Sequence, residues 1–254
     1  MNSLLISLAF FNKKGIILKN NKYNKVMKEV YDEIYPDHYK YKNTELNHTK
    51  NMLLKNLNEL EITLDSLKTK TVFNIGTGIE TIAFHELGAK QIFHYDISNT
   101  SVKRLQQLKS SNKKFKNINS SQKDVCEVGL KIPDKIDIVY LVGVLHHFHS
   151  PIQALNNILP NVNINGRLFI RIYRSGNLRS FVADFARKFI SDSCRPLFNS
   201  IYKSKFGDFK YGNGAWKKNI FAHLYQIMFD DLFVPTLFFF KPDLLENFFY
   251  RKWI

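Results

Sequence analysis

Between residues 70 and 172, short apolar runs alternate with segments whose apolar residues recur at helical spacing. This alternation of strand and helix patterns is typical of an α/β fold with a doubly wound, mostly parallel sheet. The expected strands lie near residues 71–75, 91–95, 116–120, 136–142 and 167–172.

Two of the intervening helices have clear boundary signals. The first is expected to run from about Ile79 to Leu87, because Gly88 suits the left-handed residue that follows a helix. The other follows Ser150, a good N-cap residue, and has Pro151 at its first helical position. Both helices therefore fall between expected strands.

The segments on either side of this core are expected to be caps. We divide the chain into a helical N-terminal cap (1–69), the α/β core (70–172) and a region of cap or lid helices that completes the core (173–254). In the first segment, apolar residues at helical spacing predict a helix packed on the core. They are Leu46, Leu53, Leu54, Leu57 and Leu60.

A second helical stripe follows the last expected strand. Its favoured interpretation is an amphipathic helix that closes the core, and the alternative is a lid whose aromatic rings line a substrate pocket. The stripe consists of Leu178, Phe181, Val182, Phe185, Ala186, Phe189 and Ile190.

Composition narrows the class of protein only slightly. The net charge of +15 over 254 residues suits a nucleic acid, an anionic membrane or an acidic substrate, but the lysines are scattered, which favours a solvated basic surface. Cys126 and Cys194 have no metal-binding spacing and favour a reducing, cytoplasmic location. The apolar run at residues 4–11 is too short to span a bilayer, so no membrane association is expected.

A glycine turn directly after the first expected strand is the first chemical signal. Residues 71–75 lead into Gly76-Thr77-Gly78, and the second strand ends on Asp96, 20 residues after the first glycine. In nucleotide-binding βαβ units an acid at this position binds the ribose hydroxyls. NAD enzymes share the pattern, so it does not identify the cofactor.

Two later signals separate the alternatives. Asp124 and Val125 stand just past the third strand, and the fourth strand runs into Leu145-His146-His147. A nicotinamide enzyme leaves both features unexplained.

Taken together, these motifs resemble those of the class I (Rossmann-like) S-adenosylmethionine-dependent methyltransferases. The resemblance covers residues 70–172 and implies a methyltransferase that uses S-adenosylmethionine as its cofactor. The matching segments are Val72–Gly78, His94–Ile97, Asp124-Val125, Asp137–Tyr140, Val144–Phe148 and Asn165–Ile170.

The resemblance also implies a role for individual residues. Asp96 would bind the ribose, and Asp124 would accept a hydrogen bond from the adenine amine. The other implied cofactor contacts come from the glycine turn, the residue after Asp124 and the end of the fourth strand: Gly76, Thr77, Gly78, Val125, Val142 and Gly143.

Methyl transfer depends mainly on proximity and in-line orientation, and a general base is needed only for an alcohol or a protonated amine. His146 and His147, with His149 nearby, lie beside the expected transfer point. One of them could act as that base, and the alternative is that they only cap the loop. Tyr173 and Arg174 follow the fifth strand and are candidates for binding the acceptor.

The chain departs from the family pattern in two places. Asn74 stands where the family commonly has an acid. The family's sheet ends in an antiparallel hairpin, whereas here Pro242–Phe249 reads as the helix before that hairpin and the sequence stops at Ile254, so we expect either that the hairpin is missing or that the chain is a truncated form. Residues 230–235 read as a loop that returns toward the pocket, and no third ligand accompanies Asp230 and Asp231, so no metal is expected.

The favoured function is methyl transfer to an oxygen or nitrogen atom of a small molecule. An RNA methyltransferase is the alternative that the charge suggests, but the fourth strand lacks the Asn/Asp-Pro-Pro-aromatic motif used on base amines. A degenerate protein that binds the cofactor without transferring a methyl group is the third alternative. The sequence does not specify the oligomeric state.

Overall fold

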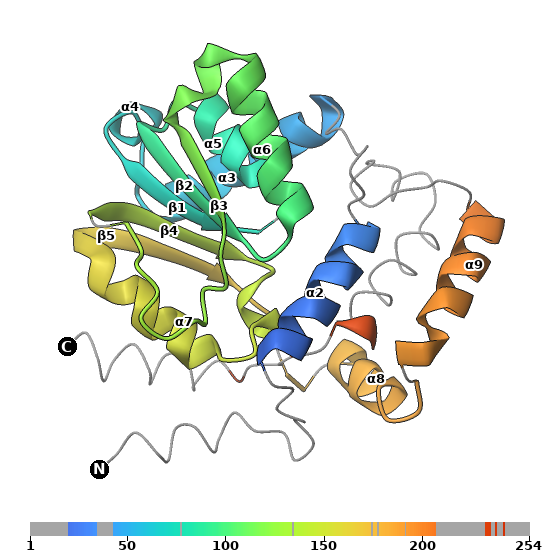
Figure 1. The fold of residues 1–254 in the computed structure, drawn as a ribbon. Coiled ribbons are helices and arrows are strands. Elements are labelled where there is room, and N and C mark those ends of the chain that lie inside the picture. The colour runs from blue at the N-terminus through green and yellow to red at the C-terminus, as the bar shows by residue number, and fades with distance from the viewer. Residues whose placement is uncertain are drawn as a thin grey trace, which may run out of the picture.

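Five parallel strands form one sheet in the order β3-β2-β1-β4-β5 (Figure 1). The strands are β1 (Thr71–Ile75), β2 (Gln91–Asp96), β3 (Ile118–Gln122), β4 (Ile136–Val142) and β5 (Val162–Arg171). This computed structural model describes residues 20–34, 43–76, 78–133, 135–173, 175–176, 178–190, 192–206, 232–234, 237 and 241. The predicted doubly wound α/β sheet is confirmed.

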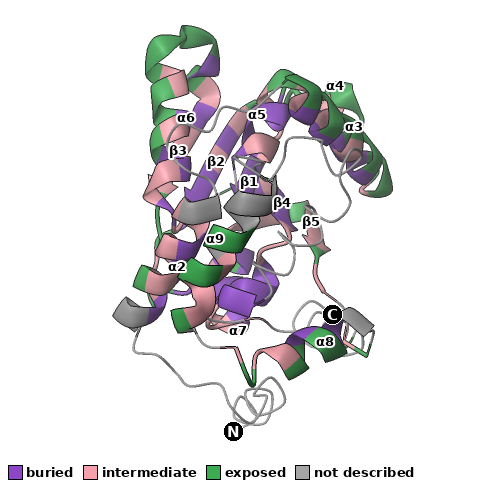
Figure 2. Ribbon diagram, turned by 90° about the vertical axis from the view of Figure 1, so that its right-hand side faces the viewer, coloured by how far each residue is buried: buried purple, intermediate pink, exposed green. Residues whose placement is uncertain are grey.

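Alternate residues of the central strands face two separate cores, as the two-residue period of a strand requires. Val72, Ile138 and Tyr140 face helices α3, α5 and α6, whereas Phe73 and Val139 face α7. The sheet therefore lies between two helical layers, and its central strands are the most deeply buried, whereas β5 at the edge is partly exposed (Figure 2). The helix bounds are α3 (Asn43–Glu59), α4 (Leu64–Leu67), α5 (Ile79–Glu86), α6 (Asn99–Ser111) and α7 (Pro151–Ile158).

Two strand boundaries were predicted wrongly. Strand β3 starts at Ile118 because residues 113–117 first form a short 3-10 helix. Strand β5 starts at Val162, five residues before the predicted start, and its polar beginning concealed it. The pairing with β4 shifts register there, and Asn165 adopts a positive φ of 64°. Such a bulge breaks the apolar pattern by which a buried strand is predicted.

The helices with boundary signals were predicted correctly. Helix α5 ends at Glu86 with Leu87 as its C-cap, and Gly88 follows with a φ of 96°. Helix α7 has Ser150 at its N-cap and Pro151 at its first position.

Helix α3 confirms the predicted helix in the first segment and packs on the sheet. Leu53 and Leu57 are buried beside Tyr140, whose hydroxyl accepts a hydrogen bond from Asn56 Nδ2 at 2.7 Å. Leu54, which the prediction placed in the same stripe, is 37% exposed. Apolar residues at helical spacing thus predicted the helix, but one leucine faces solvent.

Helix α2 (Asn20–Ile34) belongs to a third, separate cluster of apolar side chains. Tyr23, Met27 and Val30 are buried there together with residues 232–234. Both carbonyls at the ends of that short segment accept hydrogen bonds from the Arg187 guanidinium. Of the loop predicted at 230–235, the described part thus packs on α2, whereas Asp230, Asp231 and Pro235 lie outside the described residues.

Helix α8 (Leu178–Ala186) does not close the core with its predicted apolar stripe. Phe181, Phe185 and Phe189 are 69%, 54% and 72% exposed, and α8 is largely green in Figure 2. Instead, Ser180 and Ala183 are buried. The period of the stripe predicted the helix, but it did not determine which side of the helix would face the protein.

Helix α9 (Arg195–Phe206) follows α8. No helix in the described ranges is long and apolar enough to cross a membrane. The predicted helix at Pro242–Phe249 and the expected absence of a terminal hairpin lie outside the described residues.

Candidate cofactor site at the carboxyl edge of the sheet

The order of the sheet reverses between β1 and β4, which are neighbours although two strands separate them in the sequence. In open α/β sheets the loops that leave such a switch point diverge, and ligands bind in the crevice between them. Gly76 follows β1 and Gly143 follows β4, so both glycines stand at this crevice.

The glycines adopt backbone conformations that other residues rarely reach. Gly76 has a φ of 142° and Gly78, the N-cap of α5, a φ of 86°. A Cβ added to Gly76 would lie 3.4 Å from Val144 Cγ1 on the β4 side of the crevice. The backbone is therefore free of side chains where a ligand would approach. Thr77 lies outside the described residues.

Asp96 ends β2, and an acidic neighbour on α2 lies close to it. Asp96 Oδ1 accepts a hydrogen bond from Ser98 N at 2.8 Å. The neighbouring acid is Asp32, whose Oδ1 accepts a hydrogen bond from Ser98 Oγ at 2.7 Å. Burial raises the pKa of the Asp96 carboxyl to about 7, hydrogen bonds from Ser98 and Ser101 partly offset this rise, and the charge of Asp32 adds to it. New hydrogen-bond donors placed on Asp96 would therefore stabilise its ionised form.

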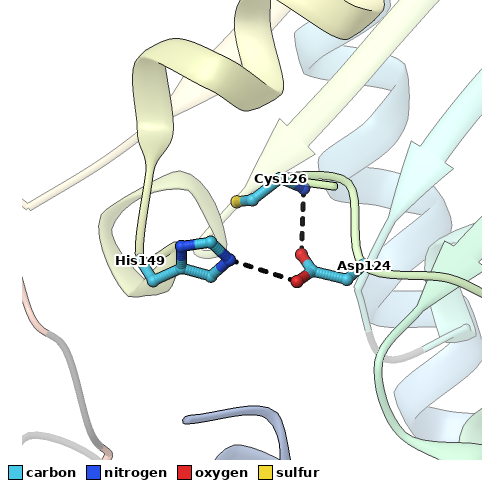
Figure 3. Close-up of side chains that lie close together, drawn as sticks. All are labelled: Asp124, Cys126 and His149. Atoms are coloured by element: carbon cyan, nitrogen blue, oxygen red, sulfur yellow. Dashed lines mark hydrogen bonds and ion pairs between the residues drawn. The ribbon is translucent and has the colours of Figure 1, made fainter. Parts of the chain in front are cut away.

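Asp124 follows β3 and is fixed by contacts with Cys126 and His149, which Figure 3 shows, and with Asn24 of α2. Its Oδ1 accepts from Cys126 N at 2.9 Å, whereas its Oδ2 lies 3.1 Å from His149 Nε2 and 3.2 Å from Asn24 Nδ2. Burial alone would raise the pKa of Asp124, but the hydrogen bonds from His149 and Cys126 outweigh it and hold the pKa below its ordinary value. Asp124 is thus favoured in its ionised form, which can accept hydrogen bonds from a ligand.

Val125 and Val142 complete the predicted cofactor contacts in the described part of the chain. Val125 is buried beside Asp124, and its carbonyl accepts a hydrogen bond from Asn157 Nδ2 on α7 at 2.8 Å. Val142 is the last residue of β4, and Gly143 N next to it donates to Arg171 O at 3.0 Å. The ends of β4 and β5 are thereby held together at the crevice.

A chain of buried polar side chains runs directly behind the glycine turn. Asn74 Nδ2 donates to Thr81 Oγ1 at 2.9 Å, and Thr81 Oγ1 lies 3.0 Å from His94 Nδ1. Burial lowers the pKa of His94 to about 3, so its imidazole is neutral. Asn74 therefore links β1 to α5 and, through Thr81, to β2. Polar residues inside apolar strands were the sequence signal for this chain of contacts.

His146 and His147 lie in a short 3-10 turn after β4, and both are buried. The His146 ring stacks on Tyr173, with ring centroids 3.9 Å apart, and the His147 ring meets Tyr31 of α2 edge-on at 6.1 Å. The Tyr23 hydroxyl donates to the His147 carbonyl. The structure thus brings His146 beside Tyr173, while Arg174 lies outside the described residues.

Helix α2 is the part of the site that the sequence did not predict. Through Asn24, Asp32 and Tyr23 it contacts the loops after β3, β2 and β4, respectively. It therefore lies across the carboxyl edge of the sheet, beside both acids. These contacts join residues 66 to 124 positions apart, and no local pattern encodes such pairings.

The family model described as "Methyltransferase domain" matches residues 73–170. No curated protein sequence matches the chain.

Several solved structures resemble the fold. Magnesium protoporphyrin IX methyltransferase (ChlM) from Synechocystis PCC 6803, solved with bound SAH, is 14% identical, with a TM-score of 0.47 over 78% of this chain and 84% of that one. A putative sarcosine dimethylglycine methyltransferase from Galdieria sulphuraria is 10% identical, with a TM-score of 0.47 over 85% of this chain and 95% of that one.

The YcgJ protein from Bacillus subtilis is 16% identical, with a TM-score of 0.43, and the match covers 59% of this chain and 58% of that one. The similar region therefore spans less than two thirds of that protein.

Proposed function

We propose that this chain, whose residues 73–170 match a methyltransferase-domain model, is a class I, S-adenosylmethionine-dependent methyltransferase that methylates an oxygen or nitrogen atom of a small molecule. The observation that carries the proposal is the row of groups along the carboxyl edge of the sheet. The glycine turns after β1 and β4 lie between Asp96 on one side and the buried His146-His147 turn on the other.

The proposed contacts to the cofactor use the chemistry of each group. Asp96 accepts hydrogen bonds from both ribose hydroxyls, and Asp124 accepts one from the adenine amine. The remaining contacts are assigned to the backbone of the turns and to the apolar surroundings of the adenine: Gly76, Thr77, Gly78, Val125, Val142 and Gly143. When bound, S-adenosylmethionine supplies a methyl group on a sulfonium that needs no further activation.

The acceptor would be bound next to Tyr173 and Arg174. If it is an alcohol or a protonated amine, we assign removal of its proton to His146 or His147. His146 is fully buried and its ring packs on both Tyr173 and His147, so an acceptor would reach the ring only after a local rearrangement. The Tyr23 hydroxyl donates a hydrogen bond to the His147 carbonyl and so holds the turn after β4 in place.

A small acceptor is favoured over RNA because α2 and the buried segment 232–234 lie over the carboxyl edge. We propose that the flanking regions 1–69 and 173–254 act as caps that enclose this edge. The net charge of +15 is the one observation that supports an RNA acceptor.

Transfer of an isotopic label separates these proposals. The full chain is incubated with methyl-labelled S-adenosylmethionine and, separately, with a metabolite extract and with total RNA. We expect label in the metabolite fraction and none with Asp96→Asn. Label in RNA alone would overturn the small-molecule proposal, and bound cofactor without transfer to either pool would support a degenerate protein.

Cofactor affinity is expected to rise with pH. Asp96 must be ionised to accept both ribose hydroxyls, and burial raises its pKa to about 7, so a proton must leave when the cofactor binds at lower pH. The Kd for S-adenosylhomocysteine should therefore rise about tenfold when the pH is lowered from 8 to 6. Calorimetric titrations at the two pH values measure this change.

Asp32→Asn is the matched control, since its Oδ1 can still accept from Ser98 Oγ but its negative charge is gone. Removing that charge lowers the pKa of Asp96, so the pH dependence should move to lower pH. An affinity that is equal at pH 6 and pH 8 in the unmodified chain would contradict the role given to Asp96.

A further inference from the structure

A carboxylate, a thiol and an imidazole come together beside the proposed adenine position (Figure 3). They belong to Asp124 and Cys126, in the loop after β3, and to His149, in the turn before α7. One ligand atom from each lies within 4.8 Å of the other two. Among the residues that the structure describes, no other group of three such side chains is found.

We propose that Asp124, Cys126 and His149 bind a divalent cation of the zinc type, and that this cation and the cofactor exclude one another. Carboxylate oxygen, thiolate sulfur and imidazole nitrogen are the three ligand types that Zn²⁺ uses in proteins. A thiolate among them disfavours Mg²⁺ and Ca²⁺, which prefer oxygen ligands.

The geometry is close to that of a three-residue zinc site. Bonds of about 2.0–2.3 Å in a tetrahedral arrangement place neighbouring ligand atoms about 3.3–3.6 Å apart. Asp124 Oδ2 and His149 Nε2 are already 3.1 Å apart. The widest separation in the cluster, up to 4.8 Å, must therefore shorten by about 1 Å. Water would occupy the fourth position.

The surroundings orient each ligand. Cys126 N donates to Asp124 Oδ1, and Asn24 Nδ2 donates to Oδ2, whose other contact, with His149 Nε2, would give way to the cation. The His149 ring packs edge-on against Tyr23, with centroids 4.8 Å apart. Burial and the Asp124 charge raise the pKa of the Cys126 thiol, and backbone groups of Ser150 and His149 offset this only in part, so the bound cation itself would have to stabilise the thiolate.

A cation can reach the cluster from the side of the two polar residues. The side chains of His149 and Asp124 are 18% and 15% exposed, whereas Cys126 is buried behind them. On binding, the Cys126 thiol loses its proton to solvent, and the proton on His149 Nε2 leaves that nitrogen, with Nδ1 carrying the ring proton, so that Nε2 exchanges its contact with Asp124 for a bond to the cation. No oxidant or other reactant is needed.

Exclusion of the cofactor rests on the proposed function of Asp124. A carboxylate oxygen bound to a cation no longer accepts a hydrogen bond from the adenine amine, and the ligated His149 is held at the same place. Because coupling between two ligands is reciprocal, zinc should weaken S-adenosylhomocysteine binding by the same factor by which that ligand weakens zinc binding.

The cation site is tested without any cofactor. The full chain is titrated with Zn²⁺ by calorimetry and with Co²⁺ by absorption, since thiolate ligation of Co²⁺ gives a distinct charge-transfer band. We expect one cation per chain, at least tenfold weaker Zn²⁺ binding in Cys126→Ser, and loss of the thiolate band in that variant. Cys194→Ser, which removes the other cysteine, should change neither.

Zinc that fails to bind the folded chain, or binds Cys126→Ser equally well, would overturn the site. If Cys126→Ser does not fold, the thiolate band of the unmodified chain, its persistence in Cys194→Ser and its loss in His149→Gln decide the matter. In a competition titration, S-adenosylhomocysteine affinity should fall at least tenfold with Zn²⁺ present. An unchanged affinity would overturn the exclusion, whereas a chain that binds zinc but no S-adenosylhomocysteine would instead count against the proposed function.

Discussion

Asp96→Asn is expected to weaken S-adenosylhomocysteine binding about 100-fold, or about 2.7 kcal/mol. In our proposal the carboxylate accepts hydrogen bonds from both ribose hydroxyls, and hydrogen bonds to a charged group contribute about 1.5–3 kcal/mol each. An amide can accept at only one oxygen and carries no charge, so most of this energy is lost. Calorimetric titration of the two proteins at pH 8 measures the difference.

The same substitution should make the unliganded protein more stable at pH 8. Burial raises the pKa of Asp96 from 3.8 to about 7, so the folded state binds the proton more tightly than the unfolded state. The folded protein therefore loses stability as pH rises from about 4 to 7, and the loss is complete above pH 7. Removing the carboxylate should restore up to about 4 kcal/mol at pH 8 and much less at pH 4.

Urea unfolding of both proteins at the two pH values checks this result. Ser98 N can still donate to the side-chain oxygen of the introduced asparagine, so the local turn is kept. A variant that binds as tightly as the unmodified chain, or that is less stable at pH 8, would show that Asp96 serves the fold and not the cofactor.

Gly76→Val is expected to reduce cofactor binding by at least about 100-fold. The φ of 142° at Gly76 strains any residue with a Cβ, by about 1–3 kcal/mol. The new Cβ would lie 3.4 Å from Val144 Cγ1, and its two methyl groups would extend into the crevice between β1 and β4. The backbone strain at residue 76 and the methyl groups in the crevice should therefore both weaken cofactor binding.

Gly88→Val separates these two causes. Gly88 also has a positive φ, 96°, and a Cβ there would meet Lys68 Cγ at 3.5 Å, but it stands after α5, at the opposite edge of the sheet. We expect both variants to lose stability in urea unfolding and only Gly76→Val to lose affinity in calorimetry. Equal affinities in the two variants would contradict the placement of the cofactor at the glycine turn.

The sequence predicted those parts of the fold that local patterns encode. The five expected strands are all present, although β3 is mostly polar, and the signals at Gly88 and Pro151 located two helix boundaries correctly. The start of β5 was missed because its polar, bulged beginning interrupts the apolar run on which the prediction depended.

Contacts between distant segments were not predictable in the same way. The stripe on α8 predicted a helix, but its phenylalanines face solvent, since periodicity does not say what a helix packs against. Likewise, Asn24 and Asp32 reach the proposed cofactor site only because α2 crosses the carboxyl edge. Cys126 and His149 have no recognisable metal spacing and meet only through the fold.

Calorimetric titration of the folded, full chain with S-adenosylhomocysteine at pH 8 tests the central claim most directly. We predict one binding site per chain with a Kd in the micromolar range, or about −7 to −8 kcal/mol. Absence of binding by a chain that unfolds cooperatively would contradict a cofactor site at the carboxyl edge of this sheet.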